Sequence, residues 1–160
     1  MSFKFEVSGM EELVAKMAKL PDKGRDVAAL ALYEGAAIVA DAVSGAVHGI
    51  ATEKFHYAKF VTRLPSPEEK AVLLQAKRGV AKFKKSKQRV DTSVGMQNAG
   101  YGKIKDKTVP IPKIANAINS GTSFMEPQPF FRQAVETSAG AAAAAIEGGI
   151  QSRLDELSLD

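Results

Sequence analysis

The pattern of apolar and polar residues predicts a strand and then a short helix at the start of the chain. Apolar and polar residues alternate over residues 2–7, which is the period of two of a half-buried strand. Ser8 followed by Glu11 matches a capping box, because each side chain can bond the backbone N–H of the other residue. We therefore expect a short helix over residues 10–20.

Two long segments predict amphipathic helices. Residues 23–47 carry a wide apolar stripe at helical spacing, with alanines on its flanks. Residues 129–157 begin with a proline, which suits the first helical position, and then place apolar residues three, four or seven apart. Glycines inside this last segment cost roughly 1 kcal/mol each relative to alanine, so the helix depends on packing.

A third helix is predicted by its start signal. Residues 48–65 have no clear period and are expected to form a loop. Ser66, Pro67 and Glu69 then combine a capping serine, a proline at the first helical position and a reciprocal glutamate. This combination predicts a helix from Pro67 to about Lys77.

The remaining signals predict two strands and one more short helix. Apolar and polar residues alternate over residues 90–96, which indicates a strand. Turn-forming residues follow at 98–102, and residues 103–111 are expected to be the partner strand, with prolines near its end. Residues 113–119 are expected to be helical.

These elements together predict an α+β fold. A small, mainly antiparallel sheet is expected to pack against a long N-terminal helix and a long C-terminal helix, with residues 50–89 as a helical and basic insertion. The length of 160 residues corresponds to one domain, so we expect residues 1–160 to share one core.

The amino-acid composition excludes several kinds of chemical site. The chain has no cysteine, which excludes disulfides and thiolate metal sites, and its two histidines lack the spacing of a helical zinc pair. No apolar run approaches the roughly 18 residues of a spanning helix, so no membrane segment is expected. The common catalytic motifs are missing as well. We expect neither enzymatic activity nor a cofactor.

Positive charge is concentrated in one block. Seven of the 22 basic residues lie within residues 77–89, and the other 15 stand against 18 acidic residues elsewhere. Such a block can meet phosphate backbones or an acidic protein face, or it can be a solvated surface loop. The basic residues of this block are Lys77, Arg78, Lys82, Lys84, Lys85, Lys87 and Arg89.

The C-terminal third carries a more specific pattern. Residues 114–125 read Ile-Ala-Asn-Ala-Ile-Asn-Ser-Gly-Thr-Ser-Phe-Met, and residues 128–135 read Gln-Pro-Phe-Phe-Arg-Gln-Ala-Val. This pattern resembles the neck and tail-completion (minor tail) proteins of long-tailed double-stranded DNA phages. The family has a Glu-x-Gly-Thr-Ser element, a short linker, and a Pro-Phe-Φ-Arg-Pro-Ala stretch before a C-terminal helix. Asn119 and Gln133 replace the usual glutamate and proline.

The resemblance implies a structural role in the virion. The protein would be made in the host cytoplasm and assemble as a ring, in a hexameric arrangement, at the head–tail junction. It would complete the tail and continue the DNA conduit. Its neighbours would be head-connector and tail-tube or terminator proteins, with non-specific DNA contact through the basic block. A tail terminator ring, a stand-alone nucleic-acid-binding protein and a small enzyme are the alternatives.

The same segment supplies the expected subunit contacts. An apolar Phe-Met pair in a proline-rich loop is a candidate for partner binding, and a glycine there suits a backbone conformation that other residues resist. The alternative is that these residues only anchor the last helix. The expected interface residues are Gly121, Thr122, Ser123, Phe124, Met125, Pro129 and Phe130.

Overall fold

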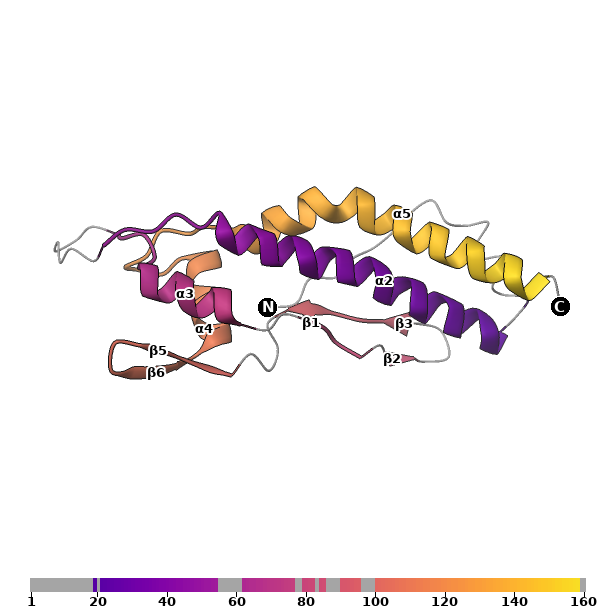
Figure 1. Cartoon of the computed structure of the whole chain (residues 1–160), viewed down its shortest axis with the longest axis horizontal. Helices are drawn as coiled ribbons and strands as arrows, with labels where there is room; N and C mark the ends of the chain where they lie inside the picture. The colour runs from indigo at the N-terminus through magenta and orange to yellow at the C-terminus, as the bar shows by residue number, and fades with distance from the viewer. Residues whose placement is uncertain are drawn as a thin grey trace. The chain divides into compact units, whose positions relative to one another are not determined.

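The fold is α+β, as expected (Figure 1). A computed structural model describes residues 19, 21–54, 62–76, 79–82, 84–85, 90–95 and 100–158. Helices in this part of the chain are α2 (Pro21–His48), α3 (Pro67–Gln75), α4 (Ile111–Ser120) and α5 (Phe130–Ser158). The strands are β1 (Gly79–Val80), β2 (Lys84–Lys85), β3 (Val90–Asp91), β4 (Val94–Gly95), β5 (Tyr101–Ile104) and β6 (Lys107–Pro110).

The long N-terminal and C-terminal helices and the helix after Ser66 are confirmed. The predicted strand over residues 2–7 and the helix over residues 10–20 lie outside the described residues, apart from Lys19. Residues 49–54 and 62–66 contain no helix, in line with the expected loop.

The strands form three two-stranded sheets instead of one: β1 pairs with β4, β2 with β3 and β5 with β6. The predicted pairing of residues 90–96 with residues 103–111 is wrong, because β5 and β6 form an antiparallel hairpin with each other. The turn of this hairpin lies at Lys105 and Asp106, where Lys105 has a φ of 53°. The turn that the sequence predicted at 98–102 therefore overlaps the start of β5.

Gly102 explains part of this error. A Cβ at Gly102 would lie 3.0 Å from Cγ2 of Val72 on α3, so the glycine permits close approach of a strand to a helix. The sequence alone does not distinguish a glycine that forms a turn from a glycine that allows a strand and a helix to pack closely.

The described residues divide into two compact units, Asp41–Gly79 with Gly95–Thr137, and a second unit that includes residues 21–40, Val80–Val94 and 138–158. The segment 50–89, expected as an insertion, is thus split between the two units. The single domain stays a prediction.

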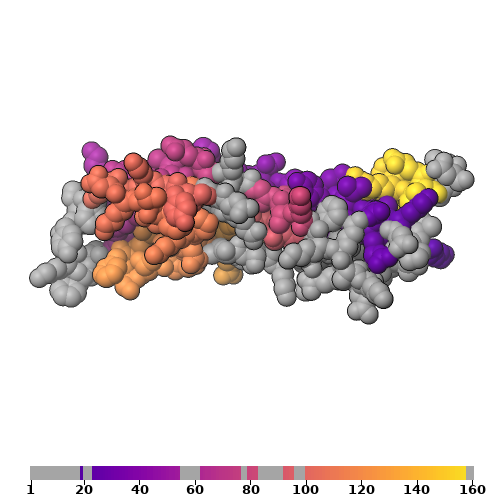
Figure 2. Space-filling view, turned by 90° about the horizontal axis from the view of Figure 1, so that it is seen from below, coloured from indigo at the N-terminus to yellow at the C-terminus, as the bar shows by residue number. Residues whose placement is uncertain are grey.

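The first unit is built on α3, α4 and the β5–β6 hairpin. Helix α3 packs against α4 and β5, and α4 packs against β6. Figure 2 shows a face on which the hairpin residues, in orange-red, lie next to α3, in magenta. The buried apolar residues of this unit are Val43, Val47, Ile50, Val72, Leu73, Ala76, Ile111, Ile114, Ile118, Met125, Phe130, Phe131 and Ala134.

Helix α3 also closes the end of α2. The Lys70 ammonium donates hydrogen bonds to the carbonyl oxygens of His48 and Ile50, both at 2.7 Å. A cation at a helix C-terminus satisfies carbonyls that have no partner within the helix and interacts favourably with the helix dipole.

The second unit is held together by the first half of α2 and the second half of α5. Its apolar cluster contains Val27, Ala31, Ile146, Ile150 and Leu154. Gly35 on α2 faces Ile146 on α5, whereas Ala31, one turn earlier on α2, lies near Gly149, so the helices are antiparallel here. Beside the cluster, the Arg153 guanidinium donates to both carboxylate oxygens of Glu34.

Helix α2 bears on the expectation that the chain has no membrane segment. Its residues Lys23–His48 are long and apolar enough to cross a membrane by length and composition, with a mean hydropathy of 1.5. The core helix of a globular protein passes the same test, and α2 buries Val27, Ala31, Val43 and Val47 against protein. One such helix is weak evidence for a membrane segment, and the absence of membrane contact stays a prediction.

Candidate functional site

The Gly-Thr-Ser sequence forms a tight turn. The backbone N–H groups of Thr122 and Met125 donate to each other's carbonyl oxygens at 3.0 and 3.3 Å. Phe124 N–H donates to Oγ1 of Thr122 at 3.2 Å. Gly121 has a φ of 74°, and a Cβ there would lie 3.0 Å from both the Met125 oxygen and the Pro127 nitrogen. This position therefore requires glycine.

The turn is fastened to the segment around Arg63. Arg63 N–H donates to the Phe124 carbonyl oxygen at 3.0 Å, and Glu126 N–H donates to the Arg63 carbonyl oxygen at 2.9 Å. The Thr62 hydroxyl adds a bond to the Glu126 carboxylate at 3.3 Å. The backbone on both sides of Phe124 is therefore held in place.

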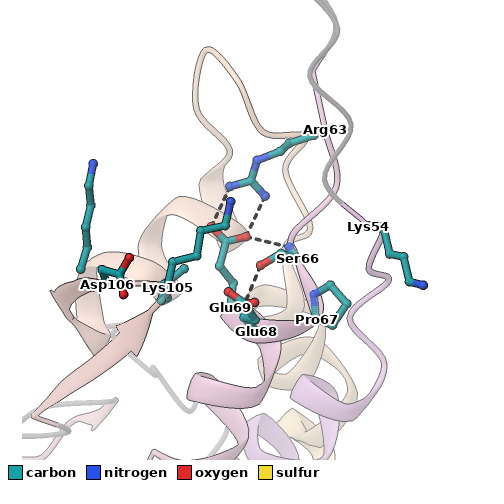
Figure 3. Close-up of a pocket in the computed structure, with 10 residues that line it drawn as sticks. Lys54, Arg63, Ser66, Pro67, Glu68, Glu69, Lys105 and Asp106 are labelled. Carbon is teal, nitrogen blue, oxygen red and sulfur yellow. Dashed lines mark hydrogen bonds and ion pairs between the residues drawn. The ribbon is translucent and has the colours of Figure 1, made fainter.

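The Arg63 side chain forms the main ion pair of this region. Its guanidinium donates to both oxygens of Glu69 at 2.7 Å, and Glu69 also accepts the Ser66 N–H at 2.7 Å (Figure 3). The Arg63 side chain is 23% exposed and that of Glu69 is 11% exposed. Ser66 Oγ accepts the Glu69 N–H, so the predicted capping box is confirmed. Lys54 points away from the pair.

This arrangement sets the charge of Glu69. Burial by itself raises the pKa of Glu69, but hydrogen bonds from Arg63 and Ser66 outweigh burial and hold the pKa below its ordinary value. For Arg63 the shift has the opposite direction, because its hydrogen bonds to Glu69 raise the pKa of the guanidinium. The pair is ionised at neutral pH.

The lowered pKa of Glu69 predicts an acid-dependent loss of stability. The ionised pair contributes fully above the ordinary pKa of 4.5, and its contribution falls as pH drops through the lower folded-state pKa. We expect the difference in unfolding free energy between wild type and Glu69→Gln to shrink steadily below about pH 4.5. Urea denaturation between pH 7 and pH 3 measures this difference, and a constant difference across that range would contradict the assigned ionisation.

Two amide side chains complete the framework. The Gln128 amide exchanges two hydrogen bonds with the backbone of Ala51, both at 2.8 Å. Buried Asn119 accepts the Phe131 N–H at 3.0 Å. Pro129 precedes α5 and has no side-chain acceptor, so Asn119 acts as the cap of that helix from α4. The sequence analysis missed the roles of Arg63 and Asn119, because neither bond follows a local spacing rule.

The expected interface residues separate into two groups. Phe124 is 77% exposed, and Thr122 and Ser123 are also exposed. Met125 and Phe130 are 6% and 3% exposed. Met125 and Phe130 are core residues of the first unit, and Met125 also lines a surface pocket described below. Their contact with a partner stays a prediction. Gly121 and Pro129 are half-buried and shape the backbone.

Gly121 therefore has a testable role. We expect Gly121→Ala to lower the free energy of unfolding by about 1–3 kcal/mol, because alanine is strained at this φ and its Cβ meets backbone atoms. Gly140→Ala is the matched control, since nothing lies within 4 Å of a Cβ there. The control should stabilise α5 by up to about 1 kcal/mol. Thermal denaturation compares them, and two changes of the same sign would contradict this role of Gly121.

Only part of the basic block is described. Lys82 is exposed, and the backbone of Lys84 and Lys85 forms β2, which pairs with β3. Lys77, Arg78, Lys87 and Arg89 lie outside the described residues. The block stays a predicted contact for DNA or an acidic partner.

Two adjoining surface pockets lie in the first unit. The larger, of about 520 Å³, includes the Arg63–Glu69 pair and the hairpin turn at Lys105 and Asp106. The smaller, of about 240 Å³, is lined by Glu69, Ile104, Lys107, Val109, Lys113, Ile114, Ala117 and Met125. Among the described residues, no group of three or more His, Asp or Glu side chains could hold a metal ion.

No protein-family model, curated protein or solved structure matches the chain.

Proposed function

We propose that this chain is a structural protein of the phage neck or tail end that works by self-assembly and has no catalytic role. The resemblance over residues 114–135 supports the phage assignment. The observation that carries self-assembly is the exposure of Phe124, 77% of which faces solvent. Its backbone is fixed on both sides by hydrogen bonds. An exposed aromatic side chain on a fixed backbone is the kind of residue that anchors protein interfaces, and it supports this proposal.

A ring is the assembly that this proposal favours. Closed rotational symmetry repeats one heterologous contact, so every subunit uses the same two surfaces. The proposed ring is hexameric and lies at the head–tail junction between head-connector and tail-tube or terminator proteins. A tail terminator ring at the same junction would use the same kind of contact.

Purified virions test the proposal directly. Mass spectrometry of particles from the phage that encodes this chain should detect it, and antibody labelling in electron micrographs should place it at the neck. Deleting its gene should leave heads and tails unjoined or tails incomplete. A protein that is missing from intact particles would overturn the proposal.

The basic block favours a second candidate, a stand-alone nucleic-acid-binding protein. Under the phage proposal, replacing Lys82, Lys84, Lys85 and Lys87 with glutamine should weaken retention of DNA in the virion or joining of the ring to its neighbours. A stand-alone binder instead predicts substantial duplex affinity in the wild type that falls steeply with salt. The charge-matched control carries Gln at exposed Lys19, Lys23, Lys54 and Lys103.

Binding of a fluorescent duplex at several salt concentrations separates these candidates. If the block binds DNA, its variant should lose affinity and show a shallower salt dependence than the control variant. Equal titre, assembly and DNA affinity in both variants would remove any role of the block.

A further inference from the structure

We propose that Phe124 of one copy inserts into the smaller pocket of a second copy, so that the two features form the contact between subunits. The proposal rests on the self-assembly proposed above and names the surfaces that would carry it. A second copy of this chain is the occupant to which the remaining observations point.

The pocket has the size and chemistry that an aromatic ring requires. Its volume is about 240 Å³, whereas a cavity of about 150 Å³ is enough to bind benzene. Its apolar lining comes from both strands of the hairpin, from α4 and from the turn: Ile104, Val109, Ile114, Ala117 and Met125. These elements pack against one another, so the pocket is preformed.

Phe124 does not fill the pocket of its own chain. Met125 lines that pocket and is 6% exposed, whereas Phe124, the preceding residue, is 77% exposed. The bonds from Phe124 N–H to Thr122 and from Arg63 N–H to the Phe124 carbonyl hold this backbone orientation. The exposed ring of Phe124 is therefore available to another chain.

Charge around the two features is complementary. Glu126 is exposed two residues after Phe124, whereas Lys107 and Lys113 are exposed at the pocket. Glu69 also contributes to the pocket, but Arg63 neutralises it. Opposite charges at the rim of an apolar contact favour the correct register and speed association.

The absence of cysteine permits a clean test by disulfide trapping. Chains carrying Ser123→Cys, an exposed position that keeps Phe124, are mixed with chains carrying Ala117→Cys and oxidised gently. We expect a mixed disulfide dimer at a level at least about tenfold above that from Ser123→Cys mixed with Ala144→Cys, an exposed alanine on α5. Val109→Cys provides a second position in the pocket, and circular dichroism verifies that each variant is folded.

A second measurement uses association without any crosslink. Sedimentation of Phe124→Ser should show self-association weakened by at least about tenfold, the effect of losing an aromatic hot spot. Phe124→Leu, which keeps an apolar side chain, should associate more strongly than Phe124→Ser and more weakly than wild type. Equal trapping at residues 117 and 144, or unchanged association of Phe124→Ser, would overturn the proposed contact.

The outcomes also separate this contact from the proposed function. If the disulfide forms preferentially at the pocket positions but the protein is absent from virions, the contact is supported and the phage role is rejected. A protein that is present in virions without selective trapping would support the role and reject the contact.

Discussion

Glu69→Gln should lower the free energy of unfolding by about 2–3 kcal/mol at pH 7, somewhat less than the loss of a fully buried ion pair. Glutamine removes the carboxylate that neutralises Arg63, while the Arg63 side chain stays only 23% exposed. It also weakens the capping box at the start of α3. The loss therefore combines an ion-pair effect with a helix-cap effect.

Glu68→Gln is the matched control for this change. Glu68 is the preceding residue, occupies the same first turn of α3 and is exposed. Its substitution should change stability by less than about 0.5 kcal/mol. Urea denaturation at pH 7 measures both variants, and equal losses would show that the Arg63–Glu69 pair does not stabilise the fold.

The position of Phe124 should respond to the same substitution. Arg63 holds the turn through its backbone and Glu69 through its side chain, so Glu69→Gln loosens the support beneath Phe124. Hydrogen exchange of the Phe124 and Met125 amides should quicken in Glu69→Gln relative to Glu68→Gln. Unchanged hydrogen exchange of these two amides would show that the Arg63–Glu69 ion pair does not support the turn.

Gly35→Leu should destabilise the second unit by about 2–3 kcal/mol through overpacking. A Cβ at Gly35 on α2 would lie 2.5 Å from Cγ1 of Ile146 and 3.0 Å from the carbonyl oxygen of Ala142, both on α5. The backbone oxygen cannot move away as a flexible side chain can, so the two helices must separate locally. The whole apolar cluster of this unit would then pack less well.

Gly45→Leu is the control in the same helix. A Cβ at Gly45 meets nothing within 4 Å, so leucine should add about 0.5–1 kcal/mol of stability through its higher helix propensity. Adding Ile146→Ala to Gly35→Leu should recover part of the loss if the clash is with that side chain. Thermal denaturation of the four proteins tests this, and destabilisation by both glycine substitutions would point to a cause other than close packing.

The helices could be predicted because their signals are local. The apolar spacing in α2 and α5 lies within each segment, and the capping box of α3 needs only residues 66–69. Pairing of β5 with β6 could not be read in the same way. Gly102 resembles a turn residue until the position of Val72 is known.

The candidate site shows the same division. A glycine-dependent turn followed by a stiff linker was visible in the residues at 121–129, because backbone preference is a property of short segments. The sequence did not show which of the two phenylalanines is exposed, because Phe124 and Phe130 lie in the same proline-containing segment. Burial depends on the residues that the rest of the chain places around each side chain. The core of the first unit covers Phe130, whereas the backbone of Phe124 is bonded to Arg63 and its side chain stays exposed.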